Sequence, residues 1–198
     1  MNNRHLFLTS DGLTKNMKTS FFNIIGKRPE EVKILYITTA GIETDGAREG
    51  IAVCLYELLL MGIQSENILI YNLDLIRSKG YKRTYSAYVT DGHIASRLIN
   101  TEELKEFDAV FVSGGDSAVL CREMVRTGFG CAIEQAVNAG LVYVGISAGS
   151  MYAAGNLEKG LNIIPNPIIP HWNGDKLTSL PIGSEEIKLA DGQTIYVE

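Results

Sequence analysis

Short apolar runs alternate with longer amphipathic stretches over the first three quarters of the chain. Val32–Thr39 and Leu141–Val144 are nearly continuous in β-branched or apolar residues, as expected for strands covered on both faces of a sheet. Similar runs occupy His5–Thr9, Ile68–Asn72 and Asp108–Val112. Stretches of helical length separate these runs. The alternation predicts a three-layer α/β fold, with a mostly parallel sheet and helices on both faces.

Three of the predicted helices have recognisable ends. The first is expected over Asp11–Ile25, with Asp11 as its N-cap and Gly26 as its stop. The second is expected over Asp45–Gly62, and the third over Ser117–Asn138. Residues 73–100 form the least patterned stretch, and we expect a loop there that lies over the functional site.

The last quarter of the chain follows a different pattern. Ile163–Pro170 is extended in character and rich in proline. Two short apolar runs, Ile187–Leu189 and Thr194–Val197, flank Asp191-Gly192, which is a pair typical of tight turns. This arrangement predicts a β-hairpin.

Length, charge and hydropathy narrow the classes of protein to consider. A chain of 198 residues is the size of one domain, and residues 1–198 are expected to form one. The formal net charge of −5, without any Lys/Arg block, disfavours nucleic acid as a partner. No apolar run approaches the length of a membrane span, and Leu6–Leu8 is too brief for a signal-peptide core, so a cytoplasmic location is expected. A homodimer formed through an exposed edge strand stays an open alternative.

The cysteines give no sign of a metal site. Cys54, Cys121 and Cys131 show neither C-x-x-C spacing nor a Cys/His metal pattern. Buried free thiols are therefore expected, with no metal and no organic cofactor.

The segment Gly145-Ile146-Ser147-Ala148-Gly149 follows a predicted strand directly. G-x-S-x-G in this position is the pattern of a nucleophile elbow, in which the glycines let the backbone turn sharply and the serine hydroxyl stands above the sheet. Ser147 is therefore the candidate nucleophile, and the N–H of Ala148, at a helix N-terminus, is a candidate oxyanion donor. The alternative is a glycine-rich turn with an incidental serine.

A second glycine turn, Ser113-Gly114-Gly115-Asp116, ends another strand of the same predicted sheet. Ligands bind at the carboxyl ends of parallel strands, so this turn is expected to face the same pocket as Ser147. Backbone N–H groups around Gly115 are expected to complete an oxyanion hole with Ala148. An ordinary turn capped by Asp116 is the alternative.

A serine nucleophile requires a general base, and the chain contains three histidines. His5 begins the first strand and His93 lies in the unpatterned stretch, whereas His171 follows the extended proline-rich run on a loop. His171 is therefore the candidate base. The usual third member is a carboxylate that orients the imidazole, and spacing does not choose among the acids that follow His171: Asp175, Glu185, Glu186 and Asp191.

Three motifs together resemble the peptidase E (alpha-aspartyl dipeptidase) and cyanophycinase family of serine peptidases: Ser113–Asp116, Gly145–Ser150 and Ile169-Pro170-His171-Trp172. The resemblance extends over nearly the whole chain and includes Leu8–Gly12 and Ile34–Ala40. It implies a fold like that of class I glutamine amidotransferases, with Ser147 in place of their nucleophilic cysteine. It also implies His171 as the base and Gly114-Gly115-Asp116 as the oxyanion loop.

Three departures from the family pattern bear on the substrate and on the triad. Asp116 stands where peptidase E proteins usually carry Asn and cyanophycinase-like members often carry Asp. Leu180-Pro181-Ile182-Gly183 lacks the glutamate of the family's Leu-Pro-Glu-Gly segment, which leaves Glu185 or Glu186 as a substitute, with Glu185 as the ranked candidate, or a Ser-His dyad. The stretches on both sides of His171 are shorter than in typical relatives, so aspartyl preference does not carry over directly.

The expected function is that of a serine peptidase that hydrolyses short peptides, with Asp-X dipeptides among the candidate substrates. A non-catalytic small-ligand-binding or regulatory protein of the same fold is the main alternative. An α/β-hydrolase esterase is disfavoured because too few residues follow Ser147 for that fold's remaining elements. A glutamine amidotransferase is disfavoured because position 147 is serine rather than cysteine.

Overall fold

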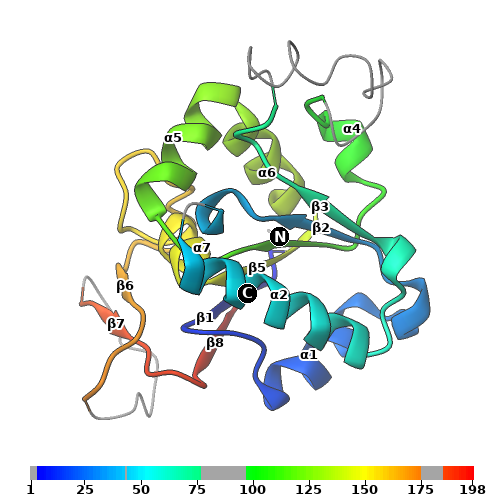
Figure 1. Ribbon diagram of the computed structural model, residues 1–198, viewed down its shortest axis with the longest axis horizontal. Coiled ribbons are helices and arrows are strands. Elements are labelled where there is room, and N and C mark those ends of the chain that lie inside the picture. Colours follow the sequence, from blue (N-terminus) through cyan, green and yellow to red (C-terminus); the bar gives the residue numbers. More distant parts are fainter. Residues whose placement is uncertain (1–3, 43, 77–96, 175–184) are drawn as a thin grey trace.

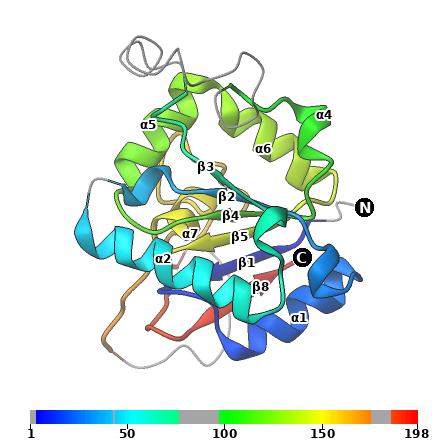
Figure 2. The ribbon, with the colours of Figure 1, turned by 45° about the vertical axis from the view of Figure 1, so that its right-hand side comes forward.

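A six-stranded sheet forms the centre of the molecule in a computed structural model that describes residues 4–42, 44–76, 97–174 and 185–198 (Figures 1 and 2). The strand order is β3-β2-β4-β5-β1-β8. Five strands are parallel, and β8 pairs with β1 in the antiparallel direction. Their bounds are β1 Leu6–Thr9, β2 Ile34–Ile37, β3 Ile68–Tyr71, β4 Ala109–Val112, β5 Val142–Ile146 and β8 Thr194–Val197.

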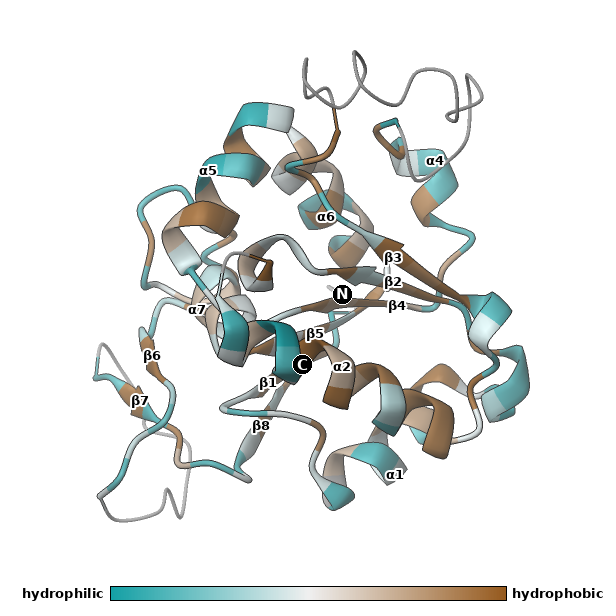
Figure 3. Cartoon of the chain, viewed as in Figure 1, coloured by the Kyte–Doolittle hydropathy of each residue, from teal (hydrophilic) through white to brown (hydrophobic). Residues whose placement is uncertain are grey.

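Helices cover both faces of this sheet, as the alternation of runs predicts. One apolar core lies between the sheet and α5 (Ser117–Thr127), α6 (Phe129–Asn138) and α7 (Ala148–Ala153), with the short α4 (Thr101–Leu104). A second core lies between the opposite face and the helices α1 (Lys15–Ile25) and α2 (Asp45–Leu60). The inner strands are apolar along their length, because each contributes side chains to both cores (Figure 3). The predicted three-layer architecture is therefore confirmed.

Two predicted helix boundaries are wrong. The N-cap of α1 is Thr14 rather than Asp11, because the Thr14 hydroxyl accepts the N–H of Met17 while an Asp11 carboxylate oxygen accepts the N–H of Gly192. The helix expected over Ser117–Asn138 is two helices, α5 and α6, separated at Gly128. Gly128 has a φ of 72°, which ends α5 in the left-handed region.

The predicted C-terminal hairpin is also wrong. β7 (Ile187–Lys188) pairs in parallel with β6 (Ile168–Ile169) in a separate two-stranded sheet. β8 instead pairs with β1 at the edge of the main sheet. The turn at Asp191-Gly192 therefore joins two different sheets, and this places Asp191 beside the end of β1. The loop expected over residues 73–100 falls largely on residues 77–96, which lie outside the described residues.

The turn between β5 and α7 packs directly on the neighbouring strand. A Cβ added at Gly149 would lie 2.2 Å from the carbonyl oxygen of Val112 in β4, and one added at Gly145 would lie 2.7 Å from the backbone of Gly149. Such distances exclude any side chain at either position unless the backbone moves. The two glycines of G-x-S-x-G are thus required by close backbone packing.

Among the described helices, none has the length and apolarity needed to cross a bilayer.

Replacement of Gly149 by alanine should lower the free energy of unfolding by about 1–3 kcal/mol, because the new methyl group overlaps a strand carbonyl. Gly50 is a matched control in the interior of α2, where an added Cβ meets nothing within 4 Å. Gly50→Ala should raise the free energy of unfolding by up to about 1 kcal/mol through helix propensity. Urea unfolding of both variants tests the pair, and equal stability of Gly149→Ala and wild type would contradict the packing argument.

Candidate functional site

Ser147 occupies a strained backbone position at the carboxyl end of β5. Its φ is 48° and its ψ −104°, a conformation that a non-glycine residue adopts only when its surroundings enforce it. The Ser147 N–H donates to the carbonyl of Thr9 at 3.0 Å. The buried hydroxyl of Ser150 donates to the same carbonyl and to that of Gly145. These bonds fasten the turn to the ends of β1 and β5 and direct the Ser147 side chain away from the sheet.

His171 lies against Ser147, as expected for a nucleophile and its base. The Nε2 atom of His171 is 3.0 Å from Ser147 Oγ. His171 follows β6 and also has a positive φ, 55°, so both residues of the pair adopt rare backbone conformations. His5, by contrast, bonds the Tyr196 hydroxyl through Nδ1, and His93 lies outside the described residues.

The carboxylate beside His171 is that of Asp191 rather than Glu185. Asp191 Oδ1 lies 2.8 Å from His171 Nδ1, the ring atom opposite the one that faces Ser147. Glu185 is exposed ahead of β7, where its carbonyl accepts a bond from Asn166. The ranking of Glu185 first is corrected because β7 pairs with β6 and β8 with β1, which brings the intervening Asp191 turn to the histidine. Asp175 falls outside the described residues.

Ser10, which sequence reasoning did not single out, links the histidine to this carboxylate. The Ser10 side chain is completely buried at the end of β1. Its hydroxyl donates to Asp191 Oδ1 at 2.8 Å and accepts the backbone N–H of His171 at 2.7 Å. The hydrogen bond from Ser10, followed by the contact with His171, lowers the pKa of Asp191 below its usual value. The sequence signal that could have indicated Ser10 is its position within the Leu8–Gly12 motif, which resembles the family's pattern.

Both glycine turns face one cavity of about 430 Å³, as expected. Gly115 has a φ of 126°, and a Cβ there would lie 2.0 Å from the carbonyl oxygen of Ala40, so only glycine fits. Ala148 is buried at the first position of α7, where an N–H has no acceptor within its own helix. The residues that line the cavity are Ser10, Asp11, Gly12, Tyr36, Gly46, Ala47, Gly50, Val53, Cys54, Glu57, Gly114, Gly115, Ile146, Ser147 and His171.

The alternative interpretation of the second glycine turn is also correct in part. The Asp116 carboxylate accepts the N–H groups of Ala118 and Val119 and so caps α5. The turn therefore has a structural cap and also borders the cavity. Asp116 itself does not line the cavity.

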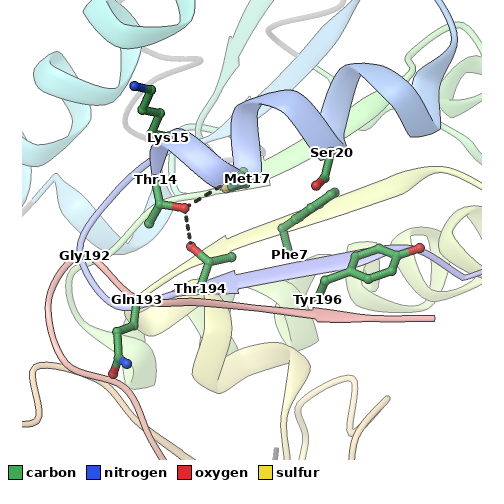
Figure 4. A pocket seen from close by; sticks show the side chains of 9 residues that line it. All are labelled: Phe7, Thr14, Lys15, Met17, Ser20, Gly192, Gln193, Thr194 and Tyr196. Atoms are coloured by element: carbon green, nitrogen blue, oxygen red, sulfur yellow. Dashed lines mark hydrogen bonds between the residues drawn. The ribbon is translucent and has the colours of Figure 1, made fainter. Parts of the chain in front are cut away.

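A second cavity, of about 480 Å³, lies between α1 and β8 (Figure 4). Thr14 and Thr194 are hydrogen-bonded to each other at 3.1 Å along its wall. Its lining contains no pairing of a nucleophile with a base among the described residues. The cavity at Ser147 is therefore the candidate functional site.

Within the described ranges, no group of three or more His, Cys, Asp or Glu side chains is arranged to hold a metal ion. The three cysteines are free thiols. Cys54 is buried as expected, whereas Cys121 is only partly buried and Cys131 is exposed, which corrects the expectation of burial for these two residues. Burial raises the pKa of the Cys54 thiol to about 12, so this cavity-lining group is a poor nucleophile.

Comparison with known proteins finds a family model and several relatives named as peptidases. A family model described as peptidase family S51 matches residues 93–197. An uncharacterized peptidase of Pasteurella multocida is 29% identical over 108 residues, which cover 46% of this chain and 50% of that protein. Peptidase E of Streptomyces coelicolor is 39% identical over 82 residues, 35% of this chain and 34% of that protein. The aligned part of the chain thus spans half or less of the length of these curated relatives.

Two solved structures share the fold. A Listeria monocytogenes protein assigned provisionally to peptidase E superposes with a TM-score of 0.65 at 21% identity, over 98% of this chain and 94% of that one. A peptidase from an acI-B1 actinobacterium gives a TM-score of 0.55 at 18% identity, over 87% and 71% of the two chains. At these identities the likeness concerns the fold, and it agrees with the expected class I glutamine amidotransferase-like architecture.

Replacement of Ser10 by alanine should raise the pKa of Asp191 toward its ordinary value, because the carboxylate loses a hydrogen bond that favours its charged form. As the pH falls, Asp191 of the variant should therefore become protonated at a higher pH than in wild type. Carbon-detected NMR titration of the carboxyl groups measures this shift. Ser113 is the matched control, because it is equally buried and its hydroxyl has no hydrogen-bond partner among the described residues. An unshifted Asp191 in Ser10→Ala would refute the assignment.

Proposed function

The chain belongs to peptidase family S51, and we propose that it is a serine peptidase that hydrolyses short peptides through an acyl-enzyme formed on Ser147. The observation that carries the proposal is the continuous chain of contacts from Ser147 Oγ to His171 Nε2 and from His171 Nδ1 to Asp191 Oδ1. A nucleophile, a base and a carboxylate in this order are what acyl transfer requires. A serine in an ordinary glycine-rich turn is not expected to show both a strained backbone conformation and an imidazole within hydrogen-bonding distance.

In the proposed mechanism, Ser147 Oγ attacks the peptide carbonyl carbon while His171 Nε2 accepts the hydroxyl proton. Asp191 holds the ring through Nδ1 and stabilises the imidazolium that forms. The N–H groups of Gly115 and Ala148 are the proposed donors to the tetrahedral oxyanion. The intermediate collapses when the C–N bond breaks and His171 returns the proton to the leaving amine. A water molecule then hydrolyses the acyl-enzyme by the same route.

The two strained backbone conformations support this mechanism. Backbone strain persists where the surrounding structure outweighs its cost, and it is concentrated at functional sites. Here the bonds that Thr9 and Ser10 make to the Ser147 and His171 backbones supply that restraint. The pair is thus held in reacting geometry before substrate arrives, so little reorganisation is needed during the reaction.

The cavity volume suits a short peptide better than a folded protein substrate. Asp-X dipeptides are the finer hypothesis, and an acidic side chain would favour an arginine in the cavity. Arg48 bonds Asp45 and the carbonyl of Ile42, whereas Arg122 and Arg126 bond Glu123. Since none of these three arginines lines the cavity, they do not support the aspartyl preference.

A fluorophosphonate probe should add one adduct to the wild-type protein, with loss of fluoride, because Ser147 is activated by His171. Intact-mass measurement should show the adduct, and Ser147→Ala should show none. Ser65→Ala, which removes an exposed hydroxyl outside the cavity and retains Ser147, should still be labelled. Folded wild-type protein that fails to react would instead favour a non-catalytic binding protein of the same fold.

The two candidate acids are separated by a second pair of variants. Asp191→Asn should reduce kcat for peptide hydrolysis by about 10³–10⁴-fold, because an amide no longer stabilises the imidazolium and can hold the wrong tautomer. Glu185→Gln removes the same charge from an exposed residue and should leave kcat within about twofold of wild type. Steady-state kinetics on a dipeptide library would decide. The reverse ranking of the two variants would restore Glu185 as the third triad member.

A further inference from the structure

The second half of α2 is apolar on its inward and its outward side. Over Ile51–Leu60, the only charged residue is Glu57. The inward side contains the buried Cys54 and Leu58, which pack in the second core. A helix that is apolar all round is ordinarily covered on every side. α2 instead forms the outer layer on its face of the sheet, beside α1 (Figures 1 and 2).

The outward side of this half-helix is exposed, and the segment is mostly brown in Figure 3. Four large apolar side chains on this side are between 45% and 67% exposed: Val53, Tyr56, Leu59 and Leu60. With the exposed Ala52, they have the spacing i, i+1, i+4, i+7 and i+8, which places them together on one side of the helix. We call these five residues the α2 patch. Single exposed apolar residues are normal, but a contiguous set of them marks a contact surface.

The neighbouring helix α1 shows the pattern that α2 lacks. The exposed residues of α1 whose side chains are described are all polar: Lys15, Thr19, Ser20 and Asn23. This is the usual composition of a helix with one covered side and one side in water. The apolar outward side is therefore a property of α2 and not of this layer as a whole.

The size of the α2 patch fits a second copy of the chain. At roughly 180 Å² for a fully exposed side chain of this size, its four large residues present roughly 400 Å² of apolar surface. Two such patches in contact cover roughly 800 Å². Because homodimer interfaces are about two-thirds apolar, the whole interface would bury roughly 1,200 Å². That area reaches the range of stable specific interfaces, about 1,200–2,000 Å².

The order of residues in the α2 patch suits antiparallel pairing about a twofold axis. With Tyr56 on the axis, Ala52 meets Leu60 of the partner subunit and Val53 meets Leu59 of the partner subunit. Each of these pairs combines a smaller side chain with a larger one, and none of the five residues carries a charge. An aromatic residue at the centre is typical of protein interfaces. The patch is thus complementary to itself.

The charges near the α2 patch disfavour a lipid surface as the partner. The exposed charged residues of α2 are Asp45, Arg48 and Glu49, and Arg48 is paired with Asp45. Helices that bind membrane surfaces instead carry lysine and arginine on their polar side, which anionic lipids attract. A protein surface is therefore the better partner.

We propose that the α2 patch is the contact surface of a homodimer, in which two α2 helices pack antiparallel about a twofold axis at Tyr56. The contact is thus assigned to a helix rather than to β3 or β8, the strands at the two edges of the main sheet. It is independent of the peptidase function, because Tyr56, Leu59 and Leu60 do not line the Ser147 cavity.

Sedimentation velocity of wild type and four variants tests the proposal. Wild type should sediment as a dimer at micromolar concentration. Tyr56→Lys and Tyr56→Glu should each raise the dissociation constant by about a hundredfold, because residue 56 faces its own copy and like charges repel. An equimolar mixture of the two should associate more tightly than either alone, since opposite charges then meet on the axis. Leu60→Lys, at the end of the patch, should weaken the dimer by about tenfold.

Val125→Lys is the matched control, because Val125 is 49% exposed on α5, which covers the opposite face of the sheet. This variant should dimerise like wild type, and circular dichroism of each variant checks that the fold is retained. Wild type that stays monomeric up to high micromolar concentration overturns the proposal. A dimer that persists unchanged in the folded Tyr56 and Leu60 variants also overturns it and places the contact elsewhere, for example at an edge strand. A mixture that associates no better than the separate Tyr56 variants refutes the twofold arrangement.

Discussion

The backbone packing at the end of β1 is the constraint on which the whole site depends. One carbonyl, that of Thr9, accepts both the Ser147 N–H and the Ser150 hydroxyl, while Gly149 lies against the carbonyl of Val112. These contacts leave no room for the turn to relax, so Ser147 stays in a conformation that it would not adopt in a free loop. The orientation of the proposed nucleophile is therefore a property of three strands and not of the turn alone.

The same strand end also positions His171, the proposed base. Ser10 follows Thr9 directly, and its hydroxyl bonds both the His171 backbone and the Asp191 carboxylate. Each of these two residues comes from a loop next to the small β6-β7 sheet, a less extensive scaffold than the main sheet. Ser10 thus connects His171 and Asp191 to the central sheet, which holds them more firmly than their own loops would. A Ser10 substitution should consequently disturb the geometry of the pair more than the stability of the fold.

The sequence predicts the layers and the contact between Ser147 and His171, but not which carboxylate lies beside His171. Buried parallel strands are recognisable because both faces are apolar, and the elbow is recognisable because its glycines are required sterically. Asp191 escapes prediction because its position depends on the pairing of β7 with β6 and of β8 with β1, and the local pattern at Asp191-Gly192 indicates a hairpin instead. Ser10 escapes because the Leu8–Gly12 motif that contains it does not indicate which of its residues contacts the histidine and the carboxylate. The division of one long predicted helix at Gly128 has the same origin, since a helical glycine and a terminating one look alike in sequence.

The proposed reacting groups and the α2 wall of the cavity differ in how firmly they are held. Ser147 lies at the end of β5, His171 in the loop after β6 and Asp191 in the turn before β8, and the buried Ser10 at the end of β1 bonds the last two. Close backbone packing at Gly145 and Gly149 restricts change at the turn that carries Ser147. On α2, by contrast, a Cβ added at Gly46 or Gly50 would meet nothing within 4 Å, although both residues line the cavity. Side chains can therefore change on this wall without displacing Ser147 or His171, and one scaffold can keep its proposed acyl-transfer geometry while the helix beside it adapts to other substrates.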